Sequence, residues 1–130
     1  MQLSIQGYLQ QRKRLNPEIF PYLNRNYLMD FYHSDEPKLW NGYLLVAIGG
    51  SKAEVPNSKE NRETFGNSGN QHSKTGQIRA LVSGMYDILN HFYLDIETEH
   101  ISASENELAK RNLKHLRAME TRQPVLAVFD

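Results

Sequence analysis

Apolar residues near the start of the chain recur at helical spacing. Ile5, Tyr8 and Leu9 fall on one face of a short first helix, which Ser4 is placed to cap. A second helix is expected after Asn16 and Pro17, a capping residue followed by the proline that suits a first helical position. Apolar side chains then recur every four residues: Ile19, Leu23, Tyr27 and Phe31. Residues 1–38 are therefore predicted to form a helical lead-in segment.

The pattern changes after Trp40. The continuous apolar run at residues 43–48 is typical of a strand that is buried on both faces, and Gly49 and Gly50 are expected to end it. Residues 51–77 contain few apolar side chains and are rich in Asn, Ser, Gly and Lys. They predict a long polar loop, which inside a compact domain is usually either functional or disordered.

The rest of the chain predicts two more strands, a helix and a final strand. Residues 78–88 and 92–97 flank a short turn and predict an antiparallel hairpin. Ser104 and Glu107 form a capping box that opens an amphipathic helix, and the apolar run at 125–129 follows it. Because this helix and strand form a crossover, the last strand is expected to lie parallel within the sheet.

We therefore expect an α/β (α+β) fold in which a partial mixed sheet occupies residues 39–130. A doubly buried strand at residues 125–129 needs covering layers, and almost no sequence follows it. The chain is accordingly expected to be truncated within this domain. Its sheet is expected to expose apolar surface, which would make the protein marginally stable or prone to aggregate.

Composition narrows the possible functions. Fifteen basic and fifteen acidic residues give no net charge, which excludes a wholly basic nucleic-acid-coating protein and a highly charged disordered tail. The absence of cysteine excludes a disulfide scaffold, a thiolate zinc site and a cysteine nucleophile, and it suits a cytoplasmic protein. The apolar runs are far shorter than the ~20 residues of a membrane helix, so no membrane partner is expected.

Most of the other titratable residues predict no site. The histidines show no metal-ligand spacing and are expected on loops or exposed faces, which argues against zinc: His33, His72, His91, His100 and His115. Asp87, Asp95 and Glu97 are expected to face solvent or to pair across strands. Glu105 and Glu107 are assigned to the start of the last helix.

Several short segments occur in a characteristic order along the chain. They are residues 45–52 (LVAIGGSK), 55–57, 60–62, 65–66, 80–83, 86–90, 94–97, 104–109 and 128–130. In order and spacing they resemble the catalytic domain of insertion-sequence transposases of the DDE type, which has a ribonuclease-H-like fold. Residues 12–18 (RKRLNPE) resemble the lead-in of such proteins, so that the likeness covers nearly the whole chain.

The resemblance implies metal-dependent cleavage and strand transfer of transposon DNA. In that family three carboxylates hold two Mg²⁺ (or Mn²⁺) ions, which activate a nucleophile and steady the leaving oxygen. Gly49 stands where the first aspartate belongs, and glycine has no ligand atom. Asp130 matches the second aspartate, and the helix with the glutamate has no counterpart in residues 1–130. The resemblance therefore implies an incomplete site and no cleavage by this chain alone.

Four cations of the polar loop are candidate DNA contacts: Lys52, Lys59, Arg62 and Lys74. Glu54, Glu60 and Glu63 nearly cancel their charge. By resemblance the partners would be transposon ends and, through retained assembly surfaces, a full-length transposase. The alternatives are a non-enzymatic α/β protein-interaction module and a remnant without function.

Overall fold

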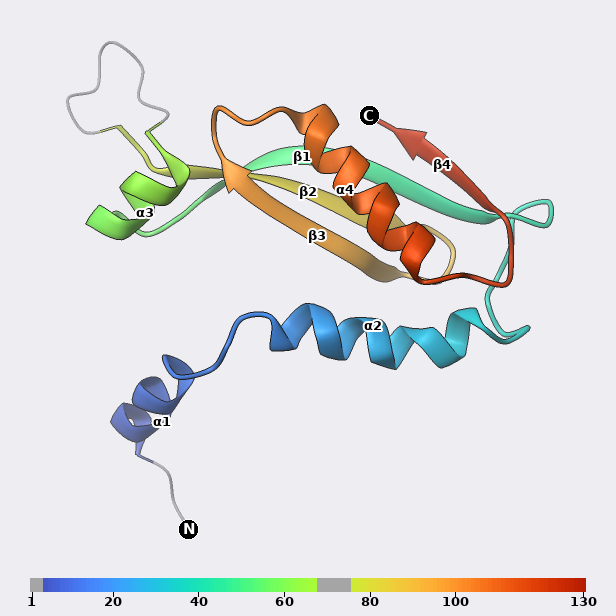
Figure 1. Cartoon of the computed structure of the whole chain (residues 1–130), viewed down its shortest axis with the longest axis horizontal. Coiled ribbons are helices and arrows are strands. Elements are labelled where there is room, and N and C mark those ends of the chain that lie inside the picture. The colour runs from blue at the N-terminus through green and yellow to red at the C-terminus, as the bar shows by residue number, and fades with distance from the viewer. Residues whose placement is uncertain (1–3, 68–75) are drawn as a thin grey trace.

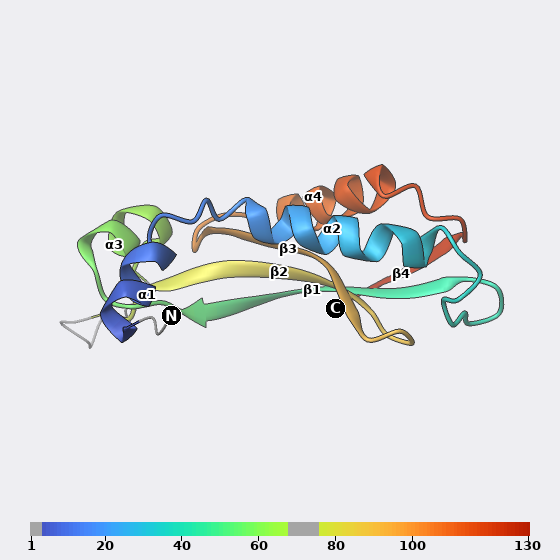
Figure 2. The same ribbon diagram turned by 90° about the horizontal axis from the view of Figure 1, so that it is seen from below.

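The computed structural model describes residues 4–67 and 76–130. The helices in these ranges are α1 (Ile5–Arg12), α2 (Ile19–Tyr32), α3 (Lys59–Phe65) and α4 (Glu105–Ala118). The strands are β1 (Leu44–Glu54), β2 (Arg79–Asp87), β3 (Phe92–His100) and β4 (Val125–Phe129). The strands form one sheet in the order β3-β2-β1-β4, and α2 and α4 lie on the same side of it (Figures 1 and 2).

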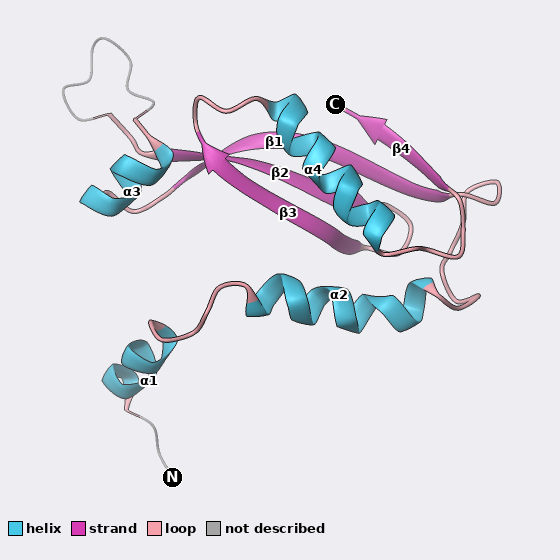
Figure 3. Ribbon diagram, viewed as in Figure 1, coloured by secondary structure: helices cyan, strands magenta, loops and turns pink. Residues whose placement is uncertain are grey.

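The sheet is mixed. β1 pairs antiparallel with β2, β2 pairs antiparallel with β3, and β4 runs parallel to β1. Helix α4 makes the crossover that carries the chain from β3 at one edge to β4 at the other (Figure 3). These features confirm the predicted α/β class, the hairpin, the crossover helix and the parallel final strand.

The prediction for residues 49–77 is wrong over much of its described part. β1 does not end at Gly49 and Gly50 but continues to Glu54, because its backbone stays paired with β2 as far as Arg79. Pairing of this kind needs backbone hydrogen bonds rather than apolar side chains, and residues 49–54 are all exposed. Helix α3 also lies within the predicted loop, and the hydroxyl of Ser58 caps it by accepting a hydrogen bond from the Asn61 N–H at 3.1 Å.

The two lead-in helices form where they were expected, but the buried face of α2 is different. The Ser4 hydroxyl accepts the Gly7 N–H at 3.0 Å, as predicted for the first cap. Helix α2 buries Leu28 and Tyr32 against the core, while the side chains on its predicted apolar stripe at 19, 23 and 27 are exposed. The reason is its placement alongside the edge strand β3, so that only part of its circumference meets the sheet (Figure 1).

The core lies between one face of the sheet and helices α2 and α4. Its members come from every layer: Leu28, Tyr32, Leu44, Val46, Ile48, Met85, Leu94, Leu116 and Met119. Burial of each large aliphatic side chain contributes roughly 1.5–3 kcal/mol before the entropy of folding is subtracted. Ser104 is the N-cap residue of α4, as expected, although its side chain makes no capping hydrogen bond.

No described helix covers the opposite face of the sheet, which we call the open face (Figure 2). Among its apolar side chains, Tyr93 and Ile96 are each 55% exposed, Val128 is 41% exposed and Leu126 is 37% exposed. This confirms the expectation of exposed apolar surface on the sheet. None of the helices in the described ranges is long and apolar enough to span a membrane.

Candidate functional site

The structure brings Gly49 and Asp130 together. The parallel pairing of β1 with β4 ends with Ile48 opposite Phe129, and the next residue on each strand is Gly49 or Asp130. The Asp130 N–H donates to the carbonyl of Ile48 at 3.3 Å. A Cβ atom built on Gly49 would lie 3.8 Å from the Cβ of Asp130. Side chains at these two positions would therefore point to one place, which we call the strand tip.

Nothing in the backbone requires glycine at position 49. Gly49 does not adopt the left-handed conformation, and within 4 Å an added Cβ would meet, among the described residues beyond its chain neighbours, the Cβ of Asp130 at ordinary van der Waals distance. Gly50 differs, because a Cβ there would lie 3.0 Å from the side-chain carboxyl carbon of Glu105. Successive strand residues face opposite sides of a sheet, so Glu105 approaches this end of β1 from the face that carries α4. The strand tip can thus accommodate a second carboxylate but has only that of Asp130.

The structure places two of the four predicted DNA-contacting cations on the same element. Lys59 and Arg62 lie on α3, whereas Lys52 lies on the exposed end of β1. Lys74 lies outside the described residues. The Lys59 ammonium pairs with Glu63 at 4.0 Å, and the Arg62 guanidinium donates to the Asn57 side-chain oxygen at 2.7 Å. All three described cations are exposed and could contact a phosphate.

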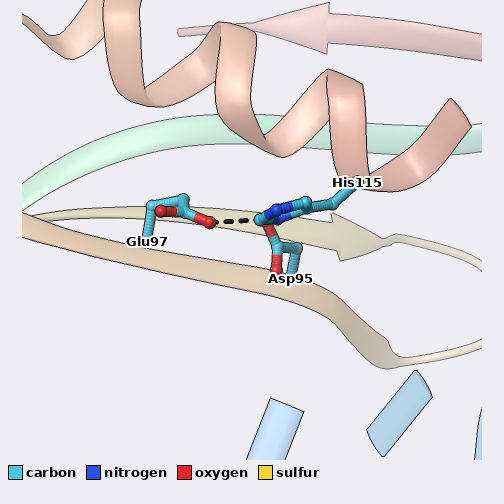
Figure 4. Close-up of side chains that lie close together, drawn as sticks. All are labelled: Asp95, Glu97 and His115. Atoms are coloured by element: carbon cyan, nitrogen blue, oxygen red, sulfur yellow. Dashed lines mark hydrogen bonds and ion pairs between the residues drawn. The ribbon is translucent and has the colours of Figure 1, made fainter. Parts of the chain in front are cut away.

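A second cluster, which the sequence predictions missed, lies under α4. Asp95 and Glu97 alternate along β3 on the face covered by α4, and His115 reaches them from the last turn of that helix (Figure 4). The His115 Nδ1 lies 2.7 Å from the Asp95 Oδ2 and 3.0 Å from the Glu97 Oε1. One possible ligand atom from each of the three residues can be chosen so that all three atoms lie within 4.8 Å of one another. We call these three residues the β3–α4 cluster.

The β3–α4 cluster is partly shielded from water. Side-chain exposure is 4% for Asp95, 17% for Glu97 and 33% for His115. Burial, and after it the charge of Asp95, raises the pKa of Glu97, while the charges of His115 and Arg111 oppose the rise. The two nearest guanidinium groups stand farther off, with Arg25 at 3.9 Å from Asp95 and Arg111 at 4.0 Å from Glu97. Two carboxylates thus share a site in which the imidazole is the nearest partner.

Buried polar groups hold Asp95 in position. The Asn112 side-chain N–H donates to the Asp95 Oδ2 at 3.0 Å, and the Ser83 hydroxyl donates to the Asn112 Oδ1 at 2.6 Å. Ser83, Asp95 and Asn112 are all buried. The expectation that Asp95 faces solvent or pairs across strands is therefore wrong, because α4 packs over this part of β3 and supplies its partners Asn112 and His115. The signal in the sequence was the i, i+2 spacing of the acids together with the i, i+3 spacing of Asn112 and His115.

Asp87 was also expected to face solvent or to pair across strands, and it is instead fully buried. Its carboxylate accepts the Tyr32 hydroxyl at 2.7 Å and the backbone N–H groups of Leu89 and Asn90 at 3.2 Å each. Burial, and after it the hydrogen bond with Asp87, raises the pKa of Tyr32 above its ordinary range. These contacts tie the end of α2 to the β2–β3 turn and indicate a structural role.

No family model, no curated protein and no solved structure matches this chain.

Proposed function

We propose that this chain is a transposase-derived protein related to the DDE-type enzymes of DNA transposition, unable to cut or join DNA by itself and able to bind DNA. The observation that carries the proposal is the position of Gly49 beside Asp130. The resemblance requires the first and second aspartates to meet at neighbouring strand tips, and positions 49 and 130 do so. We also place the protein in the cytoplasm, which its lack of cysteine suits.

The lack of cleavage follows from the ligands at the strand tip. Divalent Mg²⁺ is a hard cation that takes oxygen ligands, and in phosphoryl transfer it stabilises both the attacking and the leaving oxygen. Asp130 would hold such an ion, and position 49 supplies no side chain to share it. One carboxylate leaves the ion with mostly water ligands, so that it is held weakly and is not fixed in place.

DNA binding is supported by the exposed cations of α3 and the end of β1. Lys59 and Arg62 lie on one short helix next to the sheet, and Lys52 is exposed on the strand that leads to it. Cations of this kind contact phosphates without reading sequence, and the affinity they give falls steeply as salt rises.

An end-labelled DNA duplex with Mg²⁺ or Mn²⁺ tests the absence of cleavage. We expect no nicking by the purified chain, and nicking that Asp130→Ala abolishes would overturn this part of the proposal. Fluorescence anisotropy of the same duplex tests binding. We expect Lys59→Ala/Arg62→Ala to weaken binding and to reduce its salt dependence, whereas Lys110→Ala/Lys114→Ala on α4 serves as a charge-matched control.

The open face favours a second candidate, a non-enzymatic protein-interaction module. Contiguous apolar surface on a sheet commonly marks an interaction site. The partner that the resemblance suggests is a full-length transposase, which the chain would inhibit by joining mixed oligomers. Co-purification with a cognate transposase tests this, with Leu126→Thr/Val128→Thr as the surface variant. The second candidate would be favoured over the first if the chain shows no DNA binding even at low salt but co-purifies with the full-length transposase.

A further inference from the structure

We propose that Asp95, Glu97 and His115 bind one divalent transition-metal ion of the Zn²⁺ type. This β3–α4 cluster lies on the face of the sheet that α4 covers, whereas the side chains of the strand tip point to the open face. The proposed site is therefore separate from the carboxylate position that the proposed function concerns.

The ligand set suits Zn²⁺. One imidazole nitrogen and two carboxylate oxygens are ligands that zinc takes in proteins, and three protein ligands leave a fourth position for water. Imidazole favours Zn²⁺ over hard ions such as Mg²⁺, which prefer an all-oxygen site. His115 and Glu97 are partly exposed, so water and the ion can enter from their side.

The distances need only a small adjustment. Ligand atoms that bind one tetrahedral zinc at its usual bond lengths lie about 3.3 Å apart. The His115 Nδ1 is 2.7 Å from the Asp95 oxygen and 3.0 Å from the Glu97 oxygen, so each separation must widen by a few tenths of an ångström. His115 and Glu97 are the partly exposed members and have room to move, whereas Asp95 is fixed by Asn112.

The charges around the cluster favour a cation there. Asp95 and Glu97 place two carboxyl groups beside one imidazole, with one ligand atom of each residue within 4.8 Å of the others. Two carboxylates this close repel each other unless a positive charge lies between them. Arg111 is engaged chiefly with Glu99, at 2.8 Å, and Arg25 is about half exposed. A bound metal ion would remove this repulsion and join both acids to the imidazole.

The two elements that supply the ligands are consecutive in the chain and packed against each other. β3 supplies both acids, and the last turn of α4 supplies the histidine. A metal ion between them would fasten the far end of the crossover helix to the sheet. Because a ligand that binds only the folded state stabilises it, Zn²⁺ should raise the unfolding temperature in a concentration-dependent way.

Titration of the full chain, first freed of metal with a chelator, tests the proposal. Isothermal titration calorimetry with Zn²⁺ should show one site per chain, and Co²⁺ should give the visible absorption of a tetrahedral complex. We expect His115→Ala and Glu97→Gln each to weaken Zn²⁺ binding about tenfold or more, with the fold checked by circular dichroism. Two matched controls lie outside the cluster, and the exposed-site variants Glu36→Gln and His91→Ala should bind as the wild-type chain does.

Three results would overturn the proposal. The first is no saturable Zn²⁺ or Co²⁺ binding by the wild-type chain, a result that does not depend on how any variant folds. The second is unchanged affinity in both His115→Ala and Glu97→Gln. The third is loss of binding in Asp130→Ala, which would place the metal at the strand tip. None of these results bears on the DNA assays, so failure here and failure of the proposed function can be told apart.

Discussion

Gly49 and Asp130 are adjacent across the parallel β1–β4 pair, and a Cβ at position 49 would lie 3.8 Å from the Asp130 Cβ. The crossover through α4 creates this adjacency between residues that are 81 positions apart in the chain (130 minus 49). It places the Asp130 carboxylate beside a position that has no side chain, and it leads directly to a substitution that adds one.

Gly49→Asp should fold and should gain a response to divalent ions. The new side chain has room beside Asp130, but the two carboxylates repel each other until a cation binds between them. We expect Mg²⁺ or Mn²⁺ to raise the unfolding temperature of this variant more than that of the wild-type chain, as followed by circular dichroism.

Gly50→Asp provides the matched control for that substitution. Its Cβ would lie 3.0 Å from the carboxyl carbon of Glu105, so the variant meets both crowding and like charge. It should be destabilised, and Asp130→Ala should leave its ion response unchanged while abolishing the response of Gly49→Asp. An ion response of Gly49→Asp that survives Asp130→Ala would contradict the pairing of positions 49 and 130.

Asn112→Ala should cost about 2–3 kcal/mol of unfolding free energy. Asn112 is fully buried and bridges the Ser83 hydroxyl to the Asp95 carboxylate, so its removal leaves two buried polar groups short of a partner. Asn106→Ala, at an exposed position of the same helix, should change stability by about 0.5 kcal/mol or less. Urea unfolding measures both, and similar values would argue against a stabilising role for this network.

Tyr32→Phe should lower stability at neutral pH by about 1–2 kcal/mol, because it removes the 2.7 Å hydrogen bond to Asp87. Tyr27→Phe, on the exposed side of α2, is the control and should have little effect.

The same tyrosine predicts a pH dependence. The pKa of Tyr32 is raised in the folded protein, so its contribution is complete below the ordinary tyrosine pKa of about 10. Above that pH the unfolded chain releases the proton and the folded chain keeps it, which costs about 1.4 kcal/mol per pH unit. The stability difference between wild type and Tyr32→Phe should therefore narrow as the pH rises above 10. A stability difference between the two proteins that stays constant from pH 8 to pH 11 would contradict the raised pKa of Tyr32 in the folded protein.

Leu126→Thr/Val128→Thr should reduce self-association. Both side chains are exposed on the open face and come from the edge strand β4, where an unpaired edge and apolar surface together favour aggregation. Threonine is β-branched and suits a strand, so the unfolding free energy should change by about 1 kcal/mol or less. Sedimentation velocity over a range of concentrations should show a smaller associated fraction, and an unchanged fraction would contradict the prediction.

Periodicity in the sequence predicted most of the elements but failed where side chains do not decide the structure. The run at residues 43–48 and the alternation in residues 92–97 located β1 and β3. The expected burial of both faces was wrong for β1 and β4, because the described helices cover only one face of the sheet. The end of β1 and helix α3 were missed because they are polar and exposed. The end of β1 is held by backbone pairing with β2, and α3 is stabilised by the Ser58 cap.

The two candidate sites also differ in how far the sequence predicts them. Residues 49 and 130 could be paired from the sequence, since a crossover places the ends of parallel strands together and the resemblance named those positions. The β3–α4 cluster was missed, because the spacing of Asp95 and Glu97 along β3 does not show that His115 of α4 lies against them.

The sequence by itself determined the order of the strands and of the helices other than α3, the parallel final strand, and the glycine and aspartate at positions 49 and 130, all of which follow from local pattern and chain connectivity. Only the tertiary structure decided which acids are buried, because burial depends on how α4 and α2 lie over β2 and β3. It also decided which face of the sheet the described helices cover.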